Sequence, residues 1–491
     1  MSYDYDLLVI GSGPAGEKAA SQAAYGGKRV AVIERDPAPG GAAVHTGTLP
    51  SKTLRETALY LSGYRQAELY GLKVTLDRDL AVPRLMSRKD TVRNLEVDRI
   101  HWNLDRHHVT YQRGLARVVD PHSVEITAAD GAKSTLTATF ILIATGSEPF
   151  HPPNISFEDP DIDDSDTILE LDRLPESLTV IGGGVIGCEY ASMFAALGVR
   201  VTLIEPRNEL LSFLDAEISE ALRVALIRLG IDVRLNTGAG EVKRVGQSIV
   251  TELVEAAPMP RAPLQDMKPM ASVGSVTSDR LLFAAGRMGR TRELGLEAVG
   301  VKMQKRGYVE VDHDYRTSVP SIYAAGDVIG FPALASTSME QARVAVCHAF
   351  DLDHKRQLSE LLPYGIYTIP EVSCVGLSEE DAIARGIDVV VGRAPYKYNA
   401  RGRIIGDSDG LVKLVFEKGS KKLIGTNCIG DRATEIVHIG QALILSEGTL
   451  DTLIEMVFNY PTLAECYKYA AYDALGRLKN PGRTSEEPDG S

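Results

Sequence analysis

The stretch that decides the fold is YDLLVIGSGPAG, residues 5–16, which joins an apolar run to a glycine-rich turn. The apolar residues predict a buried strand, and Gly11, Gly13 and Gly16 follow in the spacing Gly-x-Gly-x-x-Gly. In such a turn the first glycine permits a tight bend. The second lets the backbone approach a pyrophosphate, and the third lets a helix pack closely on the strand. We therefore expect a dinucleotide-binding βαβ unit at the start of the chain.

The same pattern returns in the middle of the chain. A strand is expected over residues 178–181, and a second Gly-x-Gly-x-x-Gly follows at 182–187. Gly182 lies 171 positions after Gly11, so the second copy is an internal repeat of the first. A structural βαβ unit without a ligand is the alternative for each copy. Two copies in one chain favour two dinucleotide sites.

In each copy a helix and a second strand follow, and the strand ends at an acidic residue. This residue is Glu34 in the first copy and Glu205 in the second. A carboxylate at this position binds a ribose hydroxyl and repels a 2′-phosphate. Arg207 follows two residues after Glu205 and suits a 2′-phosphate. The second site is therefore either specific for NAD(H) or able to accept both NAD(H) and NADP(H).

The composition excludes several classes of protein. A net charge of −13 argues against nucleic acid or an anionic membrane as the main partner. No apolar run reaches about 18 residues, so no transmembrane helix is expected. The N-terminus lacks the basic region and cleavage site of a signal peptide. Five scattered cysteines indicate a reducing compartment without a disulfide framework or a metal site, so we expect a cytoplasmic protein.

Three further segments complete the expected organisation. Residues 255–275 contain four prolines and three methionines and read as a surface loop, with a partner-binding loop as the less favoured alternative. Residues 363–480 alternate strands with helices, including an expected strand at Ile404-Ile405, and predict an α+β unit. The polar tail from Pro481 is expected to be disordered.

The segment from Gly40 to Lys52 resembles the active-site segment of the flavoprotein disulfide reductases, and the motif order matches that family from Tyr5 to about Asn480. The resemblance implies an α/β fold with two Rossmann-like dinucleotide-binding domains, for FAD and NAD(P), plus a C-terminal α+β dimerisation domain. It also implies a homodimer, or a larger homo-oligomer. The implied boundaries are an FAD-binding domain at 1–148, an NAD(P)-binding domain at 149–287, a central domain completing the FAD site at 288–350, an interface domain at 351–480 and a tail at 481–491.

The chain departs from these reductases at two places. Ala43 and Thr48 stand where the family has its two redox-active cysteines, and neither side chain supplies the thiolate that dithiol chemistry needs. Tyr460 stands where the family has a catalytic histidine, although Glu465, the acid that orients that histidine, is present. A phenol with a pKa of about 10 is a poor base at neutral pH. Disulfide reduction is therefore excluded.

Hydride transfer needs no protein nucleophile, only positioning and electrostatics. The resemblance places Lys52 beside the flavin and pairs it with Glu189, and these two are the candidate catalytic residues. The candidate FAD-binding residues are Gly11, Gly13, Gly16, Glu34, Arg35, Gly41, Ala43, Lys52, Thr145, Gly146 and Asp327. The candidate NAD(P)-binding residues are Gly182, Gly184, Gly187, Glu205, Arg207 and Gly286.

The whole chain is similar to the soluble pyridine nucleotide transhydrogenases, in particular at residues 185–192, 368–371 and 458–462. That resemblance implies an FAD enzyme of the Si-specific type that exchanges hydride between NADPH and NAD⁺. An NAD(P)H dehydrogenase that passes electrons to quinones or dyes is the alternative. A flavin-dependent sensor or interaction module is a third reading, supported only by the methionine-rich segment at 255–275.

Overall fold

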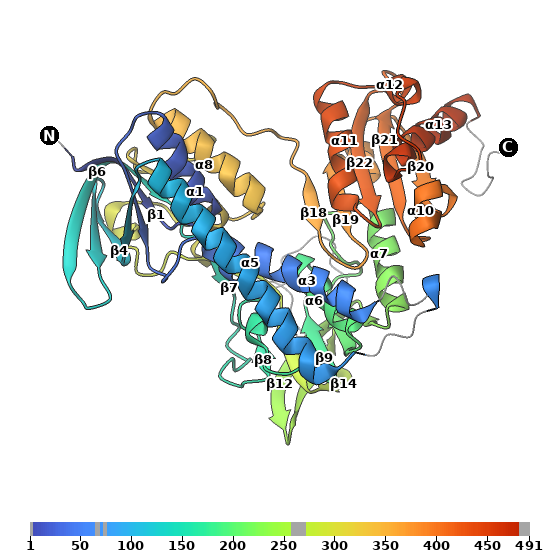
Figure 1. Cartoon of the computed structure of the whole chain (residues 1–491), viewed down its shortest axis with the longest axis horizontal. Coiled ribbons are helices and arrows are strands. Elements are labelled where there is room, and N and C mark those ends of the chain that lie inside the picture. Colours follow the sequence, from blue (N-terminus) through green and yellow to red (C-terminus); the bar gives the residue numbers. More distant parts are fainter. Residues whose placement is uncertain (1–2, 64–68, 72–75, 257–271, 481–491) are drawn as a thin grey trace.

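The computed structural model describes residues 3–63, 69–71, 76–256 and 272–480. The chain forms a first unit around the N-terminal sheet, a second unit below it and a C-terminal unit at the upper right (Figure 1). The long helix α5 (Arg78–Arg106) runs from the first unit to the second. Most of the methionine-rich segment and the whole tail from Pro481 lie outside the described residues.

The first unit is a sheet of seven strands in the order β3-β2-β1-β6-β5-β4, with β17 also paired to β6. The strands are β1 (Tyr5–Ile10), β2 (Val30–Glu34), β3 (Thr110–Arg113), β4 (Leu115–Asp120), β5 (Ser123–Thr127), β6 (Lys133–Ile143) and β17 (Ile322–Ala324). Alternate residues of β1 enter two different cores. Leu7 and Val9 pack against α1 (Pro14–Tyr25) and α8 (Ala335–Ala349), whereas Leu8 and Ile10 pack toward the β4–β5 hairpin.

The second unit repeats this arrangement with a sheet in the order β11-β10-β9-β15-β8. Its strands and helices are β8 (Ile162–Asp163), β9 (Ser177–Ile181), α6 (Val185–Ala196), β10 (Arg200–Ile204), α7 (Ala216–Arg228), β11 (Asp232–Arg234) and β15 (Arg280–Phe283). A three-stranded antiparallel sheet adjoins it, made of β12 (Thr237–Val245), β13 (Ser248–Glu255) and β14 (Ser272–Ser278).

Four shorter elements join the two units. They are α2 (Gly41–His45), α3 (Thr48–Ser62), β7 (Ser147–Pro149) and β16 (Arg287–Gly289), and the two strands pair antiparallel. Helix α5 contributes Val82 and Leu85 to the core of the second unit, and Ile100 and Leu104 to the core of the first. One helix is therefore part of both cores.

The C-terminal unit is a five-stranded antiparallel sheet in the order β18-β19-β22-β21-β20, with helices packed on it. Its elements are β18 (Tyr364–Ile366), β19 (Val372–Gly376), α9 (Glu379–Ala384), β20 (Val389–Pro395), α10 (Ala400–Ile405), β21 (Leu411–Glu417), β22 (Leu423–Ile429), α11 (Ala433–Leu445), α12 (Leu450–Glu455) and α13 (Cys466–Lys479). The expected α+β unit is present.

The prediction of a strand at Ile404-Ile405 is wrong, because both residues lie in the last turn of helix α10. The side chain of Asn399 accepts hydrogen bonds from the N–H groups of Arg401 and Gly402 and caps the start of this helix. Gly406 ends it in the left-handed conformation, with φ of 72°. The two caps outweigh the strand preference of a pair of β-branched side chains.

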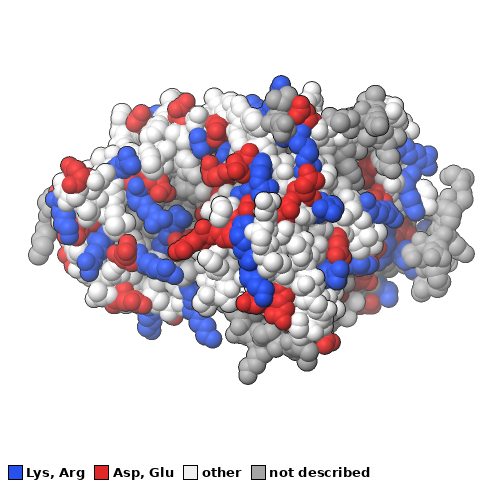
Figure 2. Space-filling model, turned by 90° about the horizontal axis from the view of Figure 1, so that it is seen from below, with Lys and Arg blue, Asp and Glu red and all other residues white. Residues whose placement is uncertain are grey.

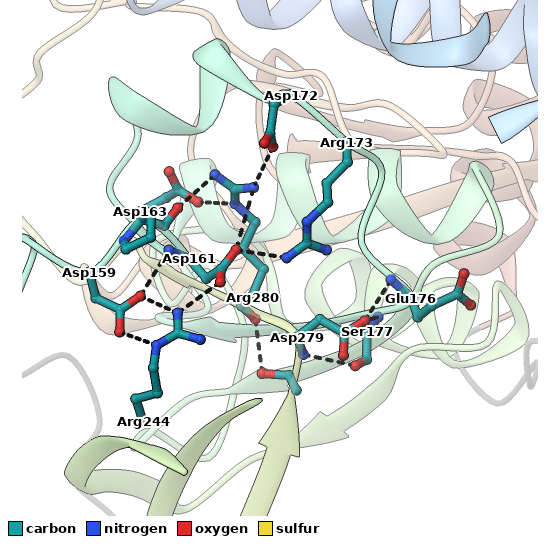
Figure 3. A network of polar contacts seen from close by, with 12 residues as sticks. Asp159, Asp161, Asp163, Asp172, Arg173, Glu176, Ser177, Arg244, Asp279 and Arg280 are labelled. Atoms are coloured by element: carbon teal, nitrogen blue, oxygen red, sulfur yellow. Dashed lines mark hydrogen bonds and ion pairs between the residues drawn. The ribbon is translucent and has the colours of Figure 1, made fainter. Parts of the chain in front are cut away.

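A dense network of ion pairs lies at the amino ends of β9 and β15 (Figure 3). Arg280 is buried, and its guanidinium contacts the carboxylates of Asp163 and Asp172. Asp279 accepts hydrogen bonds from the N–H groups of Glu176 and Ser177 at 2.9 and 3.2 Å. Ligands of parallel sheets bind at the opposite, carboxyl ends of the strands, so this network ties the second unit together away from its expected site.

Charges of both signs are mixed on one face of the molecule. Figure 2 shows Lys and Arg interspersed with Asp and Glu over the face that it presents. Across the described ranges, we find no helix that combines the length and the apolar character needed to cross a lipid bilayer.

Candidate functional site

The two glycine-rich turns have the same geometry. Gly11 and Gly182 have positive φ angles of 101° and 113°. An added Cβ would lie 2.5 Å from the carbonyl oxygen of Ala144 at Gly11, and 2.8 Å from that of Ala284 at Gly182. Each turn therefore closes against the strand beside it, and only glycine fits.

The other two glycines of each turn differ from one another. A Cβ on Gly16 or Gly187 would lie within 2 Å of the first glycine's carbonyl oxygen, at 1.9 and 1.8 Å, so helix and strand touch there. The middle glycine is open instead. Apart from the neighbours of each glycine along the chain, the nearest described atom to a Cβ on Gly13 is at 3.8 Å, and no described atom lies within 4 Å of one on Gly184. These open positions leave room for a phosphate group at the helix N-terminus.

A cavity of about 510 Å³ begins at the first turn and extends to the second unit. Most of the candidate FAD-binding residues line it, together with Glu189 from α6. These lining residues are Gly11, Gly13, Glu34, Arg35, Gly41, Ala43, Lys52, Thr145, Gly146 and Asp327. Gly16 packs helix against strand instead. The candidate NAD(P)-binding residues lie in or beside the second turn and outside this cavity wall.

The two acids hold their turns in the same way. Glu34 is buried and accepts hydrogen bonds from the N–H of Ser12 at 2.9 Å and from its hydroxyl at 2.6 Å. Glu205 is buried and accepts from the N–H of Gly183 at 2.7 Å. A carboxylate that accepts a backbone N–H fixes the shape of the turn before any ribose binds.

Lys52 and Glu189 form the contact that the resemblance implied. The Nζ of Lys52 lies 2.9 and 2.7 Å from the two carboxylate oxygens of Glu189. Glu189 also accepts the N–H of Tyr367 at 2.9 Å, and Nζ lies 4.9 Å from the centre of the Tyr367 ring. The lysine side chain keeps 26% of its surface exposed, toward the cavity that it lines. The site thus holds a fixed cation at the junction of three units.

A hydrogen-bonded chain that the sequence analysis did not identify crosses the cavity wall. Arg287 donates to the hydroxyl of Ser147 at 2.8 Å, and Ser147 donates to the carboxylate of Asp327 at 3.1 Å. Arg287 also donates to the hydroxyl of Ser165 at 3.1 Å. Of its members only Asp327 was singled out from the sequence, because the other members lie far from it along the chain. This series of hydrogen bonds orients Asp327 in the cavity wall.

The site contains no reactive sulfur. Ala43 and Thr48 both line the cavity, where the reductases that this chain resembles have their cysteines. All five cysteines of the chain are free. Burial raises the pKa of the Cys374 thiol to about 12 and of the Cys466 thiol to about 12, and it also raises that of Cys188. Thiols with such pKa values do not form thiolates at neutral pH.

Two buried hydroxyls in the cavity wall fit a bound cofactor. The Oγ1 of Thr145 and the OH of Tyr190 have no hydrogen-bond partner among the residues that the structure describes. Leaving a buried polar group unpaired costs about 1–3 kcal/mol, so a polar ligand in the cavity would offset that cost. The donors, the open glycine and the acids together fit a flavin dinucleotide.

Comparison with known proteins agrees with this geometry. The family described as pyridine nucleotide-disulphide oxidoreductase matches residues 5–349, and its dimerisation domain matches residues 362–471. The chain belongs to this family. The fold class and the family resemblance inferred from the sequence are thereby confirmed.

Relatives within the pyridine nucleotide-disulphide oxidoreductases include soluble pyridine nucleotide transhydrogenases. The protein of that name from Mycobacterium tuberculosis is 43% identical over 477 residues, which cover 97% of this chain and 98% of the relative. The one from Pseudomonas fluorescens is 40% identical over 485 residues, with 97% and 99% covered.

Solved structures of the family share the fold over almost the whole chain. LpdA from Mycobacterium tuberculosis matches with a TM-score of 0.84 at 27% identity, covering 95% of this chain and 99% of that one. The HOCl-induced flavoprotein disulfide reductase RclA from Escherichia coli matches with a TM-score of 0.82 at 26% identity, with 95% and 99% covered.

Proposed function

We propose that this chain is a soluble pyridine nucleotide transhydrogenase that exchanges hydride between NADPH and NAD⁺ through bound FAD, with the Si-specific stereochemistry of that class. One observation carries the proposal. The cavity keeps the Lys52–Glu189 pair of the family but has Ala43 and Thr48 in place of sulfur. Without the two cysteines the site cannot reduce a disulfide. Hydride exchange between nucleotides needs only a positioned flavin and nicotinamide, so the missing cysteines do not prevent it.

The residues divide the work as follows. The turn at Gly13 binds the FAD pyrophosphate, Glu34 holds the ribose end, and Asp327 binds the ribityl hydroxyls. FAD held by these residues would supply the hydride chemistry, since flavin can take up hydride from a reduced nicotinamide and give it to an oxidised one. The glycine-rich segment at Gly184 binds NADPH and NAD⁺ one after the other. Lys52 keeps a positive charge at the cavity, which stabilises electron-rich flavin, and Glu189 fixes the position of that charge.

We propose a homodimer assembled through residues 351–480. The region matched by the dimerisation domain exposes large apolar and aromatic side chains, with Val457 93% and Tyr460 74% exposed. Exposed apolar groups of this kind mark interaction surfaces when they cluster. We also propose the domain boundaries that the family resemblance implies, at 148/149, 287/288 and 350/351, and a cytoplasmic location.

The experiment that tests the function is a spectrophotometric assay of FAD-loaded enzyme with NADPH and thio-NAD⁺, and then with a quinone in place of thio-NAD⁺. Rapid reduction of thio-NAD⁺ supports the transhydrogenase. Quinone turnover without thio-NAD⁺ reduction would establish the alternative dehydrogenase instead. An apolar slot at the flavin, lined by Phe458 and Tyr460, would favour that alternative.

A further inference from the structure

A short segment just after β18, in the C-terminal unit, is bound by helix α6. The N–H of Tyr367 donates to the carboxylate of Glu189 at 2.9 Å. Two residues later, the N–H of Ile369 donates to the hydroxyl of Ser192 at 3.2 Å. Glu189 and Ser192 are both buried and lie about one helical turn apart on α6. The helix therefore fixes this segment at two points, and one of them is the acid that pairs with Lys52.

Helix α3 binds the same segment. The Nε and Nη2 of Arg55 donate to the carbonyl oxygen of Thr368 at 3.1 and 3.0 Å, and Nη2 also lies 3.3 Å from the carboxylate of Glu371. Arg55 is buried and follows Lys52 by about one helical turn. Each of the two helices thus carries one member of the Lys52–Glu189 pair and one anchor for the C-terminal unit.

The side chain of Tyr367 contacts the lysine itself. The Nζ of Lys52 lies 4.9 Å from the centre of the Tyr367 ring, within the distance at which the face of an aromatic ring attracts a cation. Both side chains line the cavity. Burial raises the pKa of the Tyr367 phenol, so the ring carries no net charge at neutral pH. The ring therefore holds the ammonium group without neutralising it, which a second carboxylate would do.

A lysine at the edge of a cavity needs such support. Its ammonium group is carried on a flexible four-carbon stem, and a single partly exposed ion pair fixes it only weakly. Here the carboxylate of Glu189 and the ring of Tyr367 both contact Nζ, and the backbone of Tyr367 holds Glu189. One residue of the C-terminal unit thus supports both members of the pair.

We propose that Tyr367 is a positioning residue that holds the ammonium group of Lys52 at the flavin site. Its N–H orients Glu189, and its ring orients Lys52. The C-terminal unit, which the dimerisation domain matches, thereby sets the electrostatics of a site that two other units build. The proposal rests on the proposed function in one respect, because it takes FAD as the occupant of the cavity. A cation held beside a flavin favours its electron-rich reduced form.

The first test is the midpoint potential of bound FAD, measured against a reference dye without any nicotinamide nucleotide. Tyr367→Leu removes the ring and keeps the N–H that Glu189 accepts. Reduced FAD should become about fivefold less favoured, which corresponds to about 1 kcal/mol and lowers the two-electron potential by about 20 mV. Tyr367→Phe keeps the ring and should have the wild-type potential. A wild-type potential in Tyr367→Leu, or an equal fall in both variants, would overturn the proposal.

The second test needs no FAD. Reductive methylation with ¹³C-formaldehyde labels lysine amines and keeps their charge, and the NMR signal of Lys52 is identified by its absence in Lys52→Met. The ring current of Tyr367 should shift this signal upfield. The shift should disappear in Tyr367→Leu and remain in Tyr367→Phe. The same signal position in all three proteins would show that the ring does not hold the ammonium group, and it would contradict the proposal.

Tyr398→Leu is the matched control. In the same C-terminal unit, the Nζ of Lys397 lies 5.0 Å from the centre of the Tyr398 ring, and Tyr398 is exposed. Tyr398 is not among the described residues that line the cavity. Removing this contact should leave the FAD potential and the Lys52 signal unchanged. A fall in potential equal to that of Tyr367→Leu would overturn the proposal, because the loss of any aromatic side chain from this unit would then have the same effect.

Failure of this inference can be told from failure of the proposed function. Neither the potential nor the NMR signal involves transfer between two nucleotides. If both change as expected in Tyr367→Leu, the positioning role stands even when the thio-NAD⁺ assay is negative. If the assay is positive and Tyr367→Leu has the potential and the signal of the wild type, only the role of Tyr367 is refuted.

Discussion

Lys52 and Lys413 both join the second unit to a neighbouring part of the molecule, and their surroundings differ. Lys413 lies on β21, is 1% exposed, and pairs with Asp215, Glu217 and Glu379 at 2.8–3.0 Å. Among the described residues Lys52 forms an ion pair only with Glu189, and it keeps a quarter of its side-chain surface exposed at the cavity. Lys413 is buried in an interface among several carboxylates. Lys52 is partly exposed at the cavity, where its ammonium group can contact a ligand.

The pKa of Lys413 agrees with this difference. Burial by itself lowers the pKa of an ammonium group, but Asp215, Glu379 and Glu217 outweigh that effect and raise the pKa of Lys413 above its ordinary value. The ammonium therefore stays charged across the neutral range. Asp215 also caps the start of α7 by accepting the N–H of Glu217, so the cluster fixes the helix as well as the interface.

The largest expected effect comes from Lys413→Met. Removing the cation leaves the buried Asp215 without the cation that it pairs with, whereas Arg393 still pairs with Glu217 and Glu379. An uncompensated buried charge costs about 3–5 kcal/mol in the free energy of unfolding. Urea titration followed by circular dichroism measures it. Lys418→Met is the control on the same unit, because Lys418 forms an exposed pair with Asp388 that is worth about 0–1 kcal/mol. A loss no larger than that of the control would show that the interface does not depend on the cluster.

The next effect is kinetic. Lys52→Met removes the cation at the cavity and should slow flavin reduction by NADPH by about 100-fold, the usual result of losing one electrostatic stabiliser. Rapid mixing with observation of the flavin absorbance measures that rate. Stability should change less than in Lys413→Met, because Glu189 keeps its hydrogen bond from Tyr367. Wild-type flavin reduction in this variant would make Lys52 a structural residue like Lys413.

The smallest effect concerns the unpaired hydroxyl of Thr145. Thr145→Val keeps the shape and removes the buried Oγ1, so the FAD-free protein should gain about 1 kcal/mol of stability. FAD should bind about fivefold more weakly if that hydroxyl contacts the cofactor, a loss of about 1 kcal/mol. Thermal unfolding of the FAD-free protein and equilibrium titration with FAD give the two quantities. A stability gain with unchanged FAD affinity would separate Thr145 from the binding site.

How much the sequence revealed depended on the distance between partners along the chain. Both glycine-rich turns and their acids could be predicted, because each motif is completed within about 25 residues by local strand and turn chemistry. The cluster around Lys413 and the chain from Arg287 to Asp327 could not, since their members come from separate units. Ile404 and Ile405 were misassigned because the caps at Asn399 and Gly406 outweigh side-chain propensity.

The Lys52–Glu189 pair shows the intermediate case. Its two members lie 137 positions apart, and nothing in the local pattern connects them. Family resemblance supplied the pairing in advance, and the structure supplied the third partner, the N–H of Tyr367. Arg207 could be singled out from the sequence because it follows Glu205 so closely. Its contact with Glu205 required the folded chain.

Helix α5 helps to fix the distance between the two glycine-rich turns. Its 29 residues rise about 1.5 Å each, so it is a rod about 40 Å long, with one end in each core. Separating either end of this helix from its core would expose the apolar side chains that pack there. The helix therefore restricts how the second unit moves relative to the first, with Pro83, which lacks a backbone N–H, as its weakest point. The walls of the cavity, which come from both units, are therefore held apart by one helix that belongs to both cores.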